Sequence, residues 1–466
     1  MIFTSSLRRL ASIPGPRELP FLGHAHLFSP LGPYKLNRLV DAHADLHKRY
    51  GRVVQLRLGM PFVLLFNPDD IETMYRWEGT WPKRPLFEVL GHYRASRPDK
   101  YKHMGLVTEN GPKWLSLRKH VQILLRFPTV HSYFESQELI AGDFIEYLDR
   151  LREKNGRVRN LLPHLYLYAQ ESIGFVCFGE RLGCFEKQSK NALVLAENVT
   201  QTLDAMGKTM LSLPWWKIVK TASYRKLEQT QDYLWQCSVT HMEKAKRNVR
   251  NSDKHVFLKN LFESDLHPLD VSLLVNELFQ GGIDATATAI IMTLHYLANN
   301  KECQEKLREE VNKIKTPKQL DNCQYLHATV RESLRLSPTA VASARILPRD
   351  VIINNHHLPA NSILLGCHPV ICYQPQFFPD PLRFNPNRWL REPSKTLPHP
   401  FASLPFGMGL RMCPGRRLAE QEIKLFLTKL IQQYRIEPVN PAPVGMVMRL
   451  NLTPDRPLDF DFHCIK

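Results

Sequence analysis

Residues Leu404–Gly415 read LPFGMGLRMCPG and carry the strongest structural signal in the chain. The spacing F-x-x-G-x-R-x-C-x-G is met by Phe406, Gly409, Arg411, Cys413 and Gly415. Glycines allow a tight loop, and a helix that begins just after Cys413 would place the positive end of its dipole near a thiolate. A shielded thiolate in such a loop is suited to bind haem iron, and Arg411 is suited to pair with a haem propionate. A single buried cysteine is usually inert, but five positions at fixed spacing favour ligation. The segment predicts a cysteine-ligand loop before the last long helix, expected at about residues 415–434.

Composition indicates a packed globular protein. The chain has 466 residues, of which 43% are hydrophobic and 23% are charged, and this profile excludes disorder, collagen and coiled coil as the main state. Nine cysteines, an odd and sparse number without a CxxC pair, argue against a disulfide scaffold and favour a reducing compartment.

The formal net charge is +17, from 62 Lys and Arg against 45 Asp and Glu. Such a charge suits nucleic acid, an anionic membrane or an acidic protein partner. The basic residues are dispersed among apolar ones, and no nucleic-acid recognition motif is present, so we expect no nucleic-acid partner. The charge therefore requires another explanation.

The first residues indicate the compartment. Met1–Ser12 contains Arg8, Arg9 and several hydroxyl residues but no acid, which is typical of a mitochondrial transit segment and also compatible with an ordinary chain end. No apolar run of 18 residues occurs, so no transmembrane helix is predicted. We expect a transit segment over residues 1–12 and one domain over residues 13–466.

The pattern along the chain predicts a mainly α fold with a small β part. Short strands are expected at Val53–Leu58, at Phe62–Phe66 and within 345–366, and helical periodicity dominates residues 113–335. Residues 375–405 hold eight prolines and predict a long meandering loop.

The longest predicted helix runs from about Asp270, as its cap, to Asn300, and its apolar residues lie almost all round, as in a central buried helix. Gly281-Gly282 in its middle implies a close approach to the backbone, and Asp284 and Thr286 follow as polar groups. The alternative is a kinked core helix whose hydroxyls are satisfied internally.

Further motifs occur in a fixed order along the chain. Trp114 and Arg118 fit W-x-x-x-R, and Glu332 and Arg335 fit E-x-x-R. Together with the cysteine loop, these motifs resemble the cytochrome P-450 superfamily over residues 13–460. The resemblance implies the cytochrome P-450 fold, with the long central helix crossing a haem b whose axial ligand is Cys413.

The resemblance also assigns roles around the haem. The residues that would anchor the haem propionates are Trp114, Arg118, Arg345 and Arg411. Glu332, Arg335 and Arg383, the last in the stretch Pro381-Leu382-Arg383-Phe384, would form a buried ionic triad.

The resemblance implies Asp284 and Thr286 as the proton-relay residues, with one departure. The family motif A/G-G-x-D/E-T appears here as Gly281-Gly282-Ile283-Asp284-Ala285-Thr286, so alanine replaces the usual threonine, whose hydroxyl helps deliver protons for O–O cleavage. Thr286 lies about 100° further round the helix and is not a simple substitute. A substrate hydroxyl or an ordered water would have to fill this role.

The sequence from Cys413 to Glu422 resembles the C-x-G-R-R-x-A-E-x-E of animal mitochondrial members. In those proteins basic residues at the positions of Arg331, Arg416 and Arg417 dock an acidic, adrenodoxin-like two-iron ferredoxin, which an NADPH-dependent reductase reduces. His327 departs from the usual lysine or arginine. Such docking explains the basic charge. It also implies a peripheral enzyme on the matrix side of the inner mitochondrial membrane.

Loop sequences resemble the arthropod hydroxylases of moulting-hormone synthesis, most closely the ecdysteroid 22-hydroxylase; these are Arg94–Tyr101, Asn110–Pro112, Ser223–Leu227 and Ala340–Asp350. The implied function is a haem-thiolate monooxygenase that inserts one oxygen atom of O2 into the side chain of a steroid, an ecdysteroid precursor. Its pocket would draw on residues near 93–107, 201–213, 279–285, 339–343 and 445–449.

Two alternatives remain open at this stage. The chain could be a haem-thiolate isomerase or dehydratase that rearranges a hydroperoxide without ferredoxin, since such enzymes need no relay threonine. It could also be a non-catalytic haem-binding protein. The arginines beside the ligand loop argue against the first, and the complete set of motifs argues against the second.

Overall fold

The computed structural model describes residues 13–85, 87–186, 190–210, 212, 214–249, 255–391 and 396–465. The predicted transit segment, residues 1–12, lies outside the described residues. Within the described residues, no helix has both the length and the apolar character needed to cross a bilayer.

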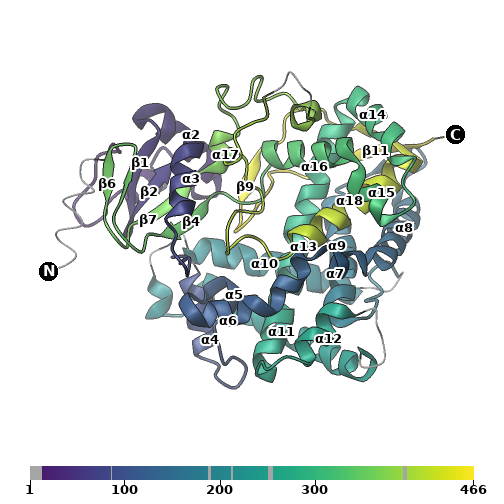
Figure 1. Ribbon diagram of the computed structural model, residues 1–466, viewed down its shortest axis with the longest axis horizontal. Helices are drawn as coiled ribbons and strands as arrows, with labels where there is room; N and C mark the ends of the chain where they lie inside the picture. The colour runs from purple at the N-terminus through teal and green to yellow at the C-terminus, as the bar shows by residue number, and fades with distance from the viewer. Residues whose placement is uncertain are drawn as a thin grey trace.

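The elements divide into a strand-rich part and a larger helical part, which lie side by side in Figure 1. The α-helices are α2 (Leu39–Tyr50), α3 (Pro68–Arg76), α4 (Glu88–Ala95), α5 (Gly105–Thr108), α6 (Gly111–Val121), α7 (Phe127–His131), α8 (Phe134–Leu151), α9 (Leu162–Phe178), α10 (Lys190–Met210), α11 (Ala222–Val249), α12 (Val256–Phe262), α13 (Pro268–Ala298), α14 (Lys301–Val311), α15 (Pro317–Asn322), α16 (Gln324–Leu336), α17 (His368–Ile371) and α18 (Arg416–Gln433). Short 3₁₀ helices are η1 (Ala25–Phe28), η2 (Leu36–Arg38), η3 (Gln122–Leu125), η4 (Trp215–Lys217) and η5 (Pro386–Trp389). The predicted mainly α fold is confirmed.

The strands form four small sheets. They are β1 (Val53–Leu58), β2 (Met60–Leu65), β3 (Arg157–Val158), β4 (Ser343–Ile346), β5 (Val351–Ile353), β6 (His356–Leu358), β7 (Ile363–Gly366), β8 (Tyr434–Pro438), β9 (Met446–Met448), β10 (Leu452–Pro454) and β11 (Phe460–Cys464). The largest has the order β1-β2-β7-β4, in which β2 and β7 are parallel and the other neighbours are antiparallel. Gly59 joins β1 to β2 with a φ of 75°, which only glycine adopts readily.

The helix α13 runs through the core, as the all-round apolar pattern predicts, and packs along α9. It begins at Pro268 and is capped by the side chain of His267, whose Nδ1 accepts from the Leu269 amide at 3.2 Å, so the predicted Asp270 cap is wrong. Proline fits the first turn because no amide donor is needed there, and the cap therefore lies three residues earlier than predicted.

The two glycines of α13 do not interrupt the helix. A Cβ on Gly282 would lie 2.6 Å from Cγ1 of Ile173 on α9, so glycine permits the two helices to pack closely. A Cβ on Gly281 would meet nothing within 4 Å, because that position faces open space. The expected close approach is therefore made by α9 at one glycine, and the other glycine faces the cavity described next.

Candidate active site

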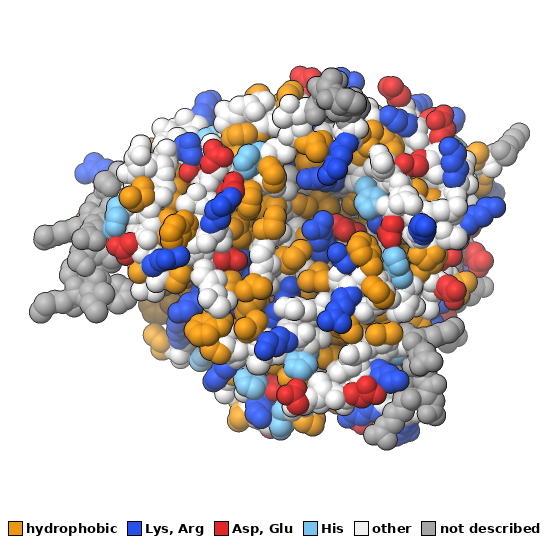
Figure 2. Space-filling view, viewed as in Figure 1, with side chains coloured by type: hydrophobic (Ala, Val, Ile, Leu, Met, Phe, Trp, Pro, Cys, Tyr) orange, Lys and Arg blue, Asp and Glu red, His pale blue; other side chains and the backbone are white. Residues whose placement is uncertain are grey.

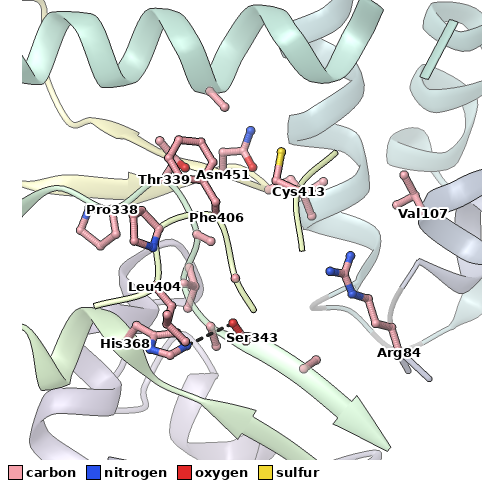
Figure 3. A pocket seen from close by; sticks show the side chains of 18 of the residues that line it. Arg84, Val107, Pro338, Thr339, Ser343, His368, Leu404, Phe406, Cys413 and Asn451 are labelled. Atoms are coloured by element: carbon pink, nitrogen blue, oxygen red, sulfur yellow. Dashed lines mark hydrogen bonds between the residues drawn. The ribbon is translucent and has the colours of Figure 1, made fainter. Parts of the chain in front are cut away.

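One cavity of about 720 Å³ brings the cysteine loop, α13 and the sheet together. Figure 3 shows Cys413 with its sulfur directed into this cavity, below a helix that crosses above it. Sequence-predicted site residues that line the cavity are Trp114, Arg118, Thr286, Arg345, Phe406, Arg411, Cys413 and Gly415. These residues are distant in sequence, and the fold gathers them around one space.

The loop holds Cys413 at the start of α18. Its amide donates to the Phe406 carbonyl at 2.9 Å, and an added Cβ on Gly415 would be 4.0 Å from its sulfur. Burial raises the pKa of the Cys413 thiol, whereas the Gly415 amide and the guanidinium of Arg118 lower it. A metal ion deprotonates a coordinating thiol outright, and these groups stabilise the resulting charge.

Four arginines surround one wall of the cavity: Arg84, Arg118, Arg345 and Arg411. Burial and then the neighbouring cations lower the pKa of Arg411 to about 9, and the same causes lower that of Arg84 to about 10. Within the described part of the chain only Arg345 has an acidic partner, Glu78, and burial raises the pKa of that carboxyl. The wall therefore carries excess buried positive charge.

Several donors in this wall have no partner in the described structure. Arg118 Nη2 donates to the Met412 carbonyl at 2.9 Å, but its Nε is unpaired. Arg411 stacks over Trp114 at 4.2 Å, and its Nε and Nη1 are unpaired. Buried unpaired cationic donors are costly, so the wall fits carboxylates such as the propionates of haem. The sulfur of Cys413 and this anion-binding wall line the same cavity, and together they fit a haem that is bound through Cys413.

Arg84 was not predicted to belong to this wall. Its Nη2 donates to the Arg411 carbonyl at 2.8 Å, and its amide donates to Asn110 Oδ1 at 3.0 Å. Asn110 Oδ1 also accepts from Arg411 Nη2 at 2.8 Å, so one side chain joins the two arginines. No local sequence pattern indicates that Arg84 belongs to this wall, since its partners Asn110 and Arg411 lie in two distant segments.

The predicted relay residues do not lie together. Ala285 and Thr286 line the cavity, whereas Asp284 does not. Asp284 is buried behind Asn451, and it accepts from Tyr166 Oη at 3.3 Å and from Asn451 Nδ2 at 2.8 Å. Asp284 therefore reaches the cavity only through Asn451, because the turn of the helix directs it toward α9 and the C-terminal segment.

The buried ionic cluster contains a different arginine from the one predicted. Arg335 forms two hydrogen bonds with Glu332 at 2.9 Å, and both side chains are fully buried. The second cation is Arg388, whose Nε is 2.8 Å from Glu332 Oε1. The Arg383 side chain is exposed, and only its carbonyl oxygen reaches the cluster. The 3₁₀ turn η5 carries Arg388 inward, so assigning Arg383 to the triad is incorrect.

The three predicted docking arginines lie at the surface beside the ligand loop. Arg331 stacks over Trp389 at 3.9 Å, Arg417 stacks over Phe127 at 3.8 Å, and Arg416 pairs with Glu420 at 3.0 Å. In the described structure neither Arg331 nor Arg417 has an acidic partner. Figure 2 shows Lys and Arg side chains spread around a hollow in this face, over α16 and α18.

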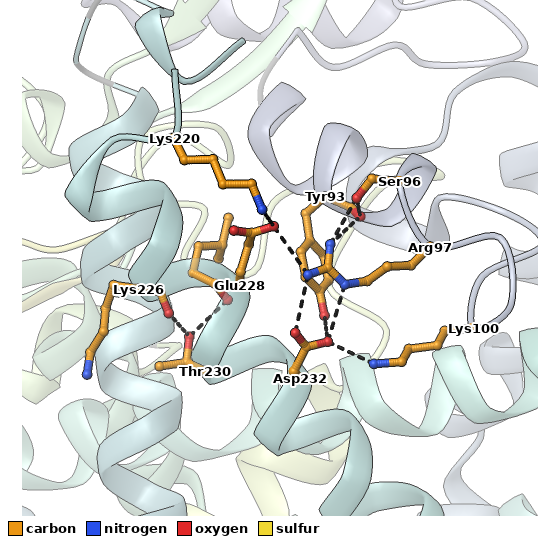
Figure 4. Close-up of polar contacts among 10 residues, drawn as sticks. Tyr93, Ser96, Arg97, Lys100, Lys220, Lys226, Glu228, Thr230 and Asp232 are labelled. Carbon is orange, nitrogen blue, oxygen red and sulfur yellow. Dashed lines mark hydrogen bonds and ion pairs between the residues drawn. The ribbon is translucent and has the colours of Figure 1, made fainter. Parts of the chain in front are cut away.

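Ion pairs hold the segment before α6 against the helical part. Asp232 on α11 accepts from Tyr93 Oη at 2.9 Å and from Lys100 Nζ at 2.8 Å, and it pairs with Arg97 at 3.2 Å (Figure 4). The same segment supplies Leu106 and Val107 to the cavity wall. These contacts cover the cavity on that side.

The other walls of the cavity include the predicted pocket residues and some that were not predicted. The expected residues near 339–343 line it, as do Met210, Met448 and Leu450, but an N-terminal portion that was not predicted also contributes Phe28 and Phe62. Most of these side chains are apolar, so this end suits a largely apolar molecule.

Comparisons with known proteins agree with this geometry. Residues 13–460 match the family model described as cytochrome P-450. Mitochondrial cytochrome P-450 302a1 of Drosophila melanogaster is 33% identical, over 97% of this chain and 94% of the relative. Ecdysone 20-monooxygenase of the same fly is 29% identical, over 93% and 85%. The mitochondrial 1,25-dihydroxyvitamin D(3) 24-hydroxylase of Rattus norvegicus is 30% identical, over 98% and 89%. The chain therefore belongs to the cytochrome P-450 family and is a monooxygenase whose haem is held by a cysteine thiolate.

Proposed function

We propose that this enzyme hydroxylates a steroid, an ecdysteroid precursor, in the mitochondrion, with electrons from a two-iron ferredoxin. The observation that carries the substrate class is the largely apolar end of the cavity, which extends from Ala285 to Phe28 and Met448. A few polar groups, among them Thr339 and Asn451, interrupt the apolar lining. Relatives named for ecdysone and for dihydroxyvitamin D(3) support the same class.

Haem, when bound, supplies the activation of O2, and the protein supplies position and charge. Arg118 and Arg411 would hold the propionates through their unpaired donors. Cys413 would bind the haem iron through its sulfur, and the nearby cations Arg118 and Arg84 would stabilise the negative charge of the thiolate. Ala285 and Gly281 leave room for substrate beside α13, and the ion pairs of Asp232 help to exclude water.

The substrate proposal is tested by reconstituted turnover. The holoenzyme is supplied with NADPH, a ferredoxin reductase, a two-iron ferredoxin and one ecdysteroid precursor at a time. The expected product carries one added oxygen atom, and its formation depends on ferredoxin. Turnover without ferredoxin, or the absence of steroid turnover in a preparation that oxidises another class of compound, would contradict the proposal.

Ferredoxin docking rests on the exposed cations Arg331 and Arg416 and on the half-buried Arg417. Arg417→Glu should weaken ferredoxin binding about tenfold at low salt and leave haem content unchanged, because a rim charge acts mainly through electrostatic attraction. Lys244→Glu makes the same charge change on α11, where Lys244 is exposed and unpaired in the described structure. Equal weakening in both variants would contradict a specific docking face.

Peripheral membrane attachment is supported by an exposed apolar segment near the cavity. Trp215, Ile218 and Val219 are 60%, 79% and 65% exposed, and Met210 and Ser212, just before them, line the cavity. We expect this segment to contact lipid, so that an apolar substrate enters from the membrane.

Co-sedimentation with anionic phosphatidylglycerol vesicles tests this attachment. Ile218→Asp should reduce the bound fraction severalfold. Leu382→Asp, at a residue that is 78% exposed elsewhere on the surface, should not. Equal loss in both variants would contradict attachment through residues 215–219.

A further inference from the structure

Asn451 lies in the turn between β9 and β10 and is held in place from two sides. The Arg449 amide donates to the Asn451 carbonyl at 2.9 Å, and the Leu452 amide donates to the Thr339 carbonyl at 2.9 Å. A Cβ on Gly207 of α10 would clash with the Arg449 carbonyl, so glycine allows α10 to pack directly on this turn. The backbone position of Asn451 is therefore fixed by its neighbours.

The carboxamide of Asn451 joins a buried acid to the cavity. Its Nδ2 donates to Asp284 Oδ2 at 2.8 Å, and Asp284 also accepts from Tyr166 Oη at 3.3 Å. Asp284 is 3% exposed and does not line the cavity, whereas Asn451 does. Burial raises the pKa of Asp284, and its hydrogen bond with Asn451 opposes that shift.

The orientation of the amide follows from its partner. In the structure Nδ2 of Asn451 faces Asp284 and Oδ1 faces the other way, which is the orientation that an ionised carboxylate requires because it only accepts hydrogen bonds. In Figure 3 Asn451 stands beside Thr339 and near Cys413, below the crossing helix. No group in the described residues donates to its Oδ1. The cavity thus presents an oriented hydrogen-bond acceptor at its largely apolar end.

We infer that Asn451 is a specificity-determining residue that accepts a hydrogen bond from a hydroxyl group of the substrate, with Asp284 as the positioning residue behind it. The inference deepens the proposed steroid hydroxylation and rests on it for the choice of scaffold. A ligand without the hydroxyl leaves the Asn451 oxygen unpaired in an apolar setting, which penalises its binding.

The test is a spectral titration of the ferric holoprotein, which needs no turnover. Matched pairs that differ by one hydroxyl are compared: cholesterol with its 22- and 25-hydroxy derivatives, vitamin D3 with 25-hydroxyvitamin D3, and a long-chain alkane with the corresponding alcohol. The wild type should bind the hydroxylated member of at least one pair about tenfold more tightly. In Asn451→Leu that ratio should fall to about one.

Two further variants separate recognition from a general disturbance. Thr339→Val removes another polar group of the same cavity that does not contact Asp284, and it should retain the preference. Asp284→Leu has a similar size but offers no acceptor to the Asn451 amide nitrogen, so it should reduce the preference. The ferrous–CO spectrum reports whether each variant loads haem, and Asn451→Ala is used if the leucine variant does not.

The outcomes distinguish this inference from the proposed function. A hydroxyl preference that survives in Asn451→Leu, or that is lost equally in Thr339→Val, overturns the inference. If only the alkane and its alcohol produce spectral shifts, the steroid proposal fails. The role of Asn451 is then still decided by the ratio of the affinities for the alcohol and the alkane in the wild type and in Asn451→Leu. Absence of a hydroxyl preference in every pair contradicts the inference directly.

Discussion

Arg388 and Arg383 provide a matched test of the buried cluster, because both follow α16 in the proline-rich loop but only Arg388 faces inward. Arg388 Nε donates to Glu332 at 2.8 Å, and its Nη1 donates to the Pro379 carbonyl at 3.1 Å. Arg388→Met removes these two bonds, together with two longer ones from Nη2 to the carbonyls of Asp380 and Arg383 at 3.5 and 3.4 Å, and keeps most of the apolar stem. Arg383→Met changes an exposed side chain whose backbone carbonyl is retained.

The expected loss follows from these contacts. Hydrogen bonds to charged groups contribute about 1.5–3 kcal/mol each. Glu332 keeps its two bonds from Arg335, so no buried charge is left alone, and the loss lies at the lower end of the two-bond total. We expect Arg388→Met to lower the free energy of unfolding by about 3 kcal/mol, and Arg383→Met by less than about 0.5 kcal/mol.

The assay is the thermal midpoint of the holoprotein, followed by the Soret band and by far-ultraviolet circular dichroism. For 466 residues, an unfolding entropy of about 2 cal/mol/K per residue gives roughly 1 °C per kcal/mol. Arg388→Met should therefore lower the midpoint by about 3 °C, and Arg383→Met by less than about 1 °C. Similar shifts in the two variants, or a larger one in Arg383→Met, would refute the assignment of Arg388 to the cluster.

Three other perturbations have expected outcomes. Ala285→Thr should be tolerated and should raise product formed per NADPH most with substrates that lack the hydroxyl near this position, while Thr286→Ala should cost little; a collapse of coupling in Thr286→Ala would make Thr286 the relay. Burial lowers the pKa of His43 to about 4 from 6.5, so the unfolded state takes up the proton first, and stability is lost as pH falls below about 6.5. Between pH 7 and pH 5 the free energy of unfolding should fall by about 2 kcal/mol less in His43→Leu than in the wild type. An unchanged slope of the thermal midpoint against pH would contradict this. Arg411→Leu should lower haem retention in a competition with apomyoglobin, whereas unchanged retention would exclude Arg411 as a propionate anchor.

Local patterns in the sequence predicted those parts of the site that depend on local geometry. The spacing around Cys413 specifies a loop and a helix start within a dozen residues, and α18 begins at Arg416 as expected. The all-round apolar pattern of α13 likewise requires burial, and the helix does lie in the core. These features follow from short-range chemistry.

The errors arose where long-range packing decides the direction of a side chain. The proline-rich loop contains Arg383 and Arg388, and only the turn η5 determines which one meets Glu332. The direction of Asp284 depends on α9 and on the C-terminal turn that carries Asn451. Arg84 contacts a carbonyl more than three hundred residues away in the sequence, and no local pattern encodes that contact.

The most direct test of haem ligation by Cys413 is the ferrous–CO spectrum of Cys413→Ser. Serine keeps the size of the side chain, but its hydroxyl is a much weaker donor to iron than a thiolate. We expect a folded protein, by far-ultraviolet circular dichroism, that has lost the thiolate-type Soret band of the wild type. A Cys413→Ser protein that retains this band at its wild-type position would show that another residue is the axial ligand.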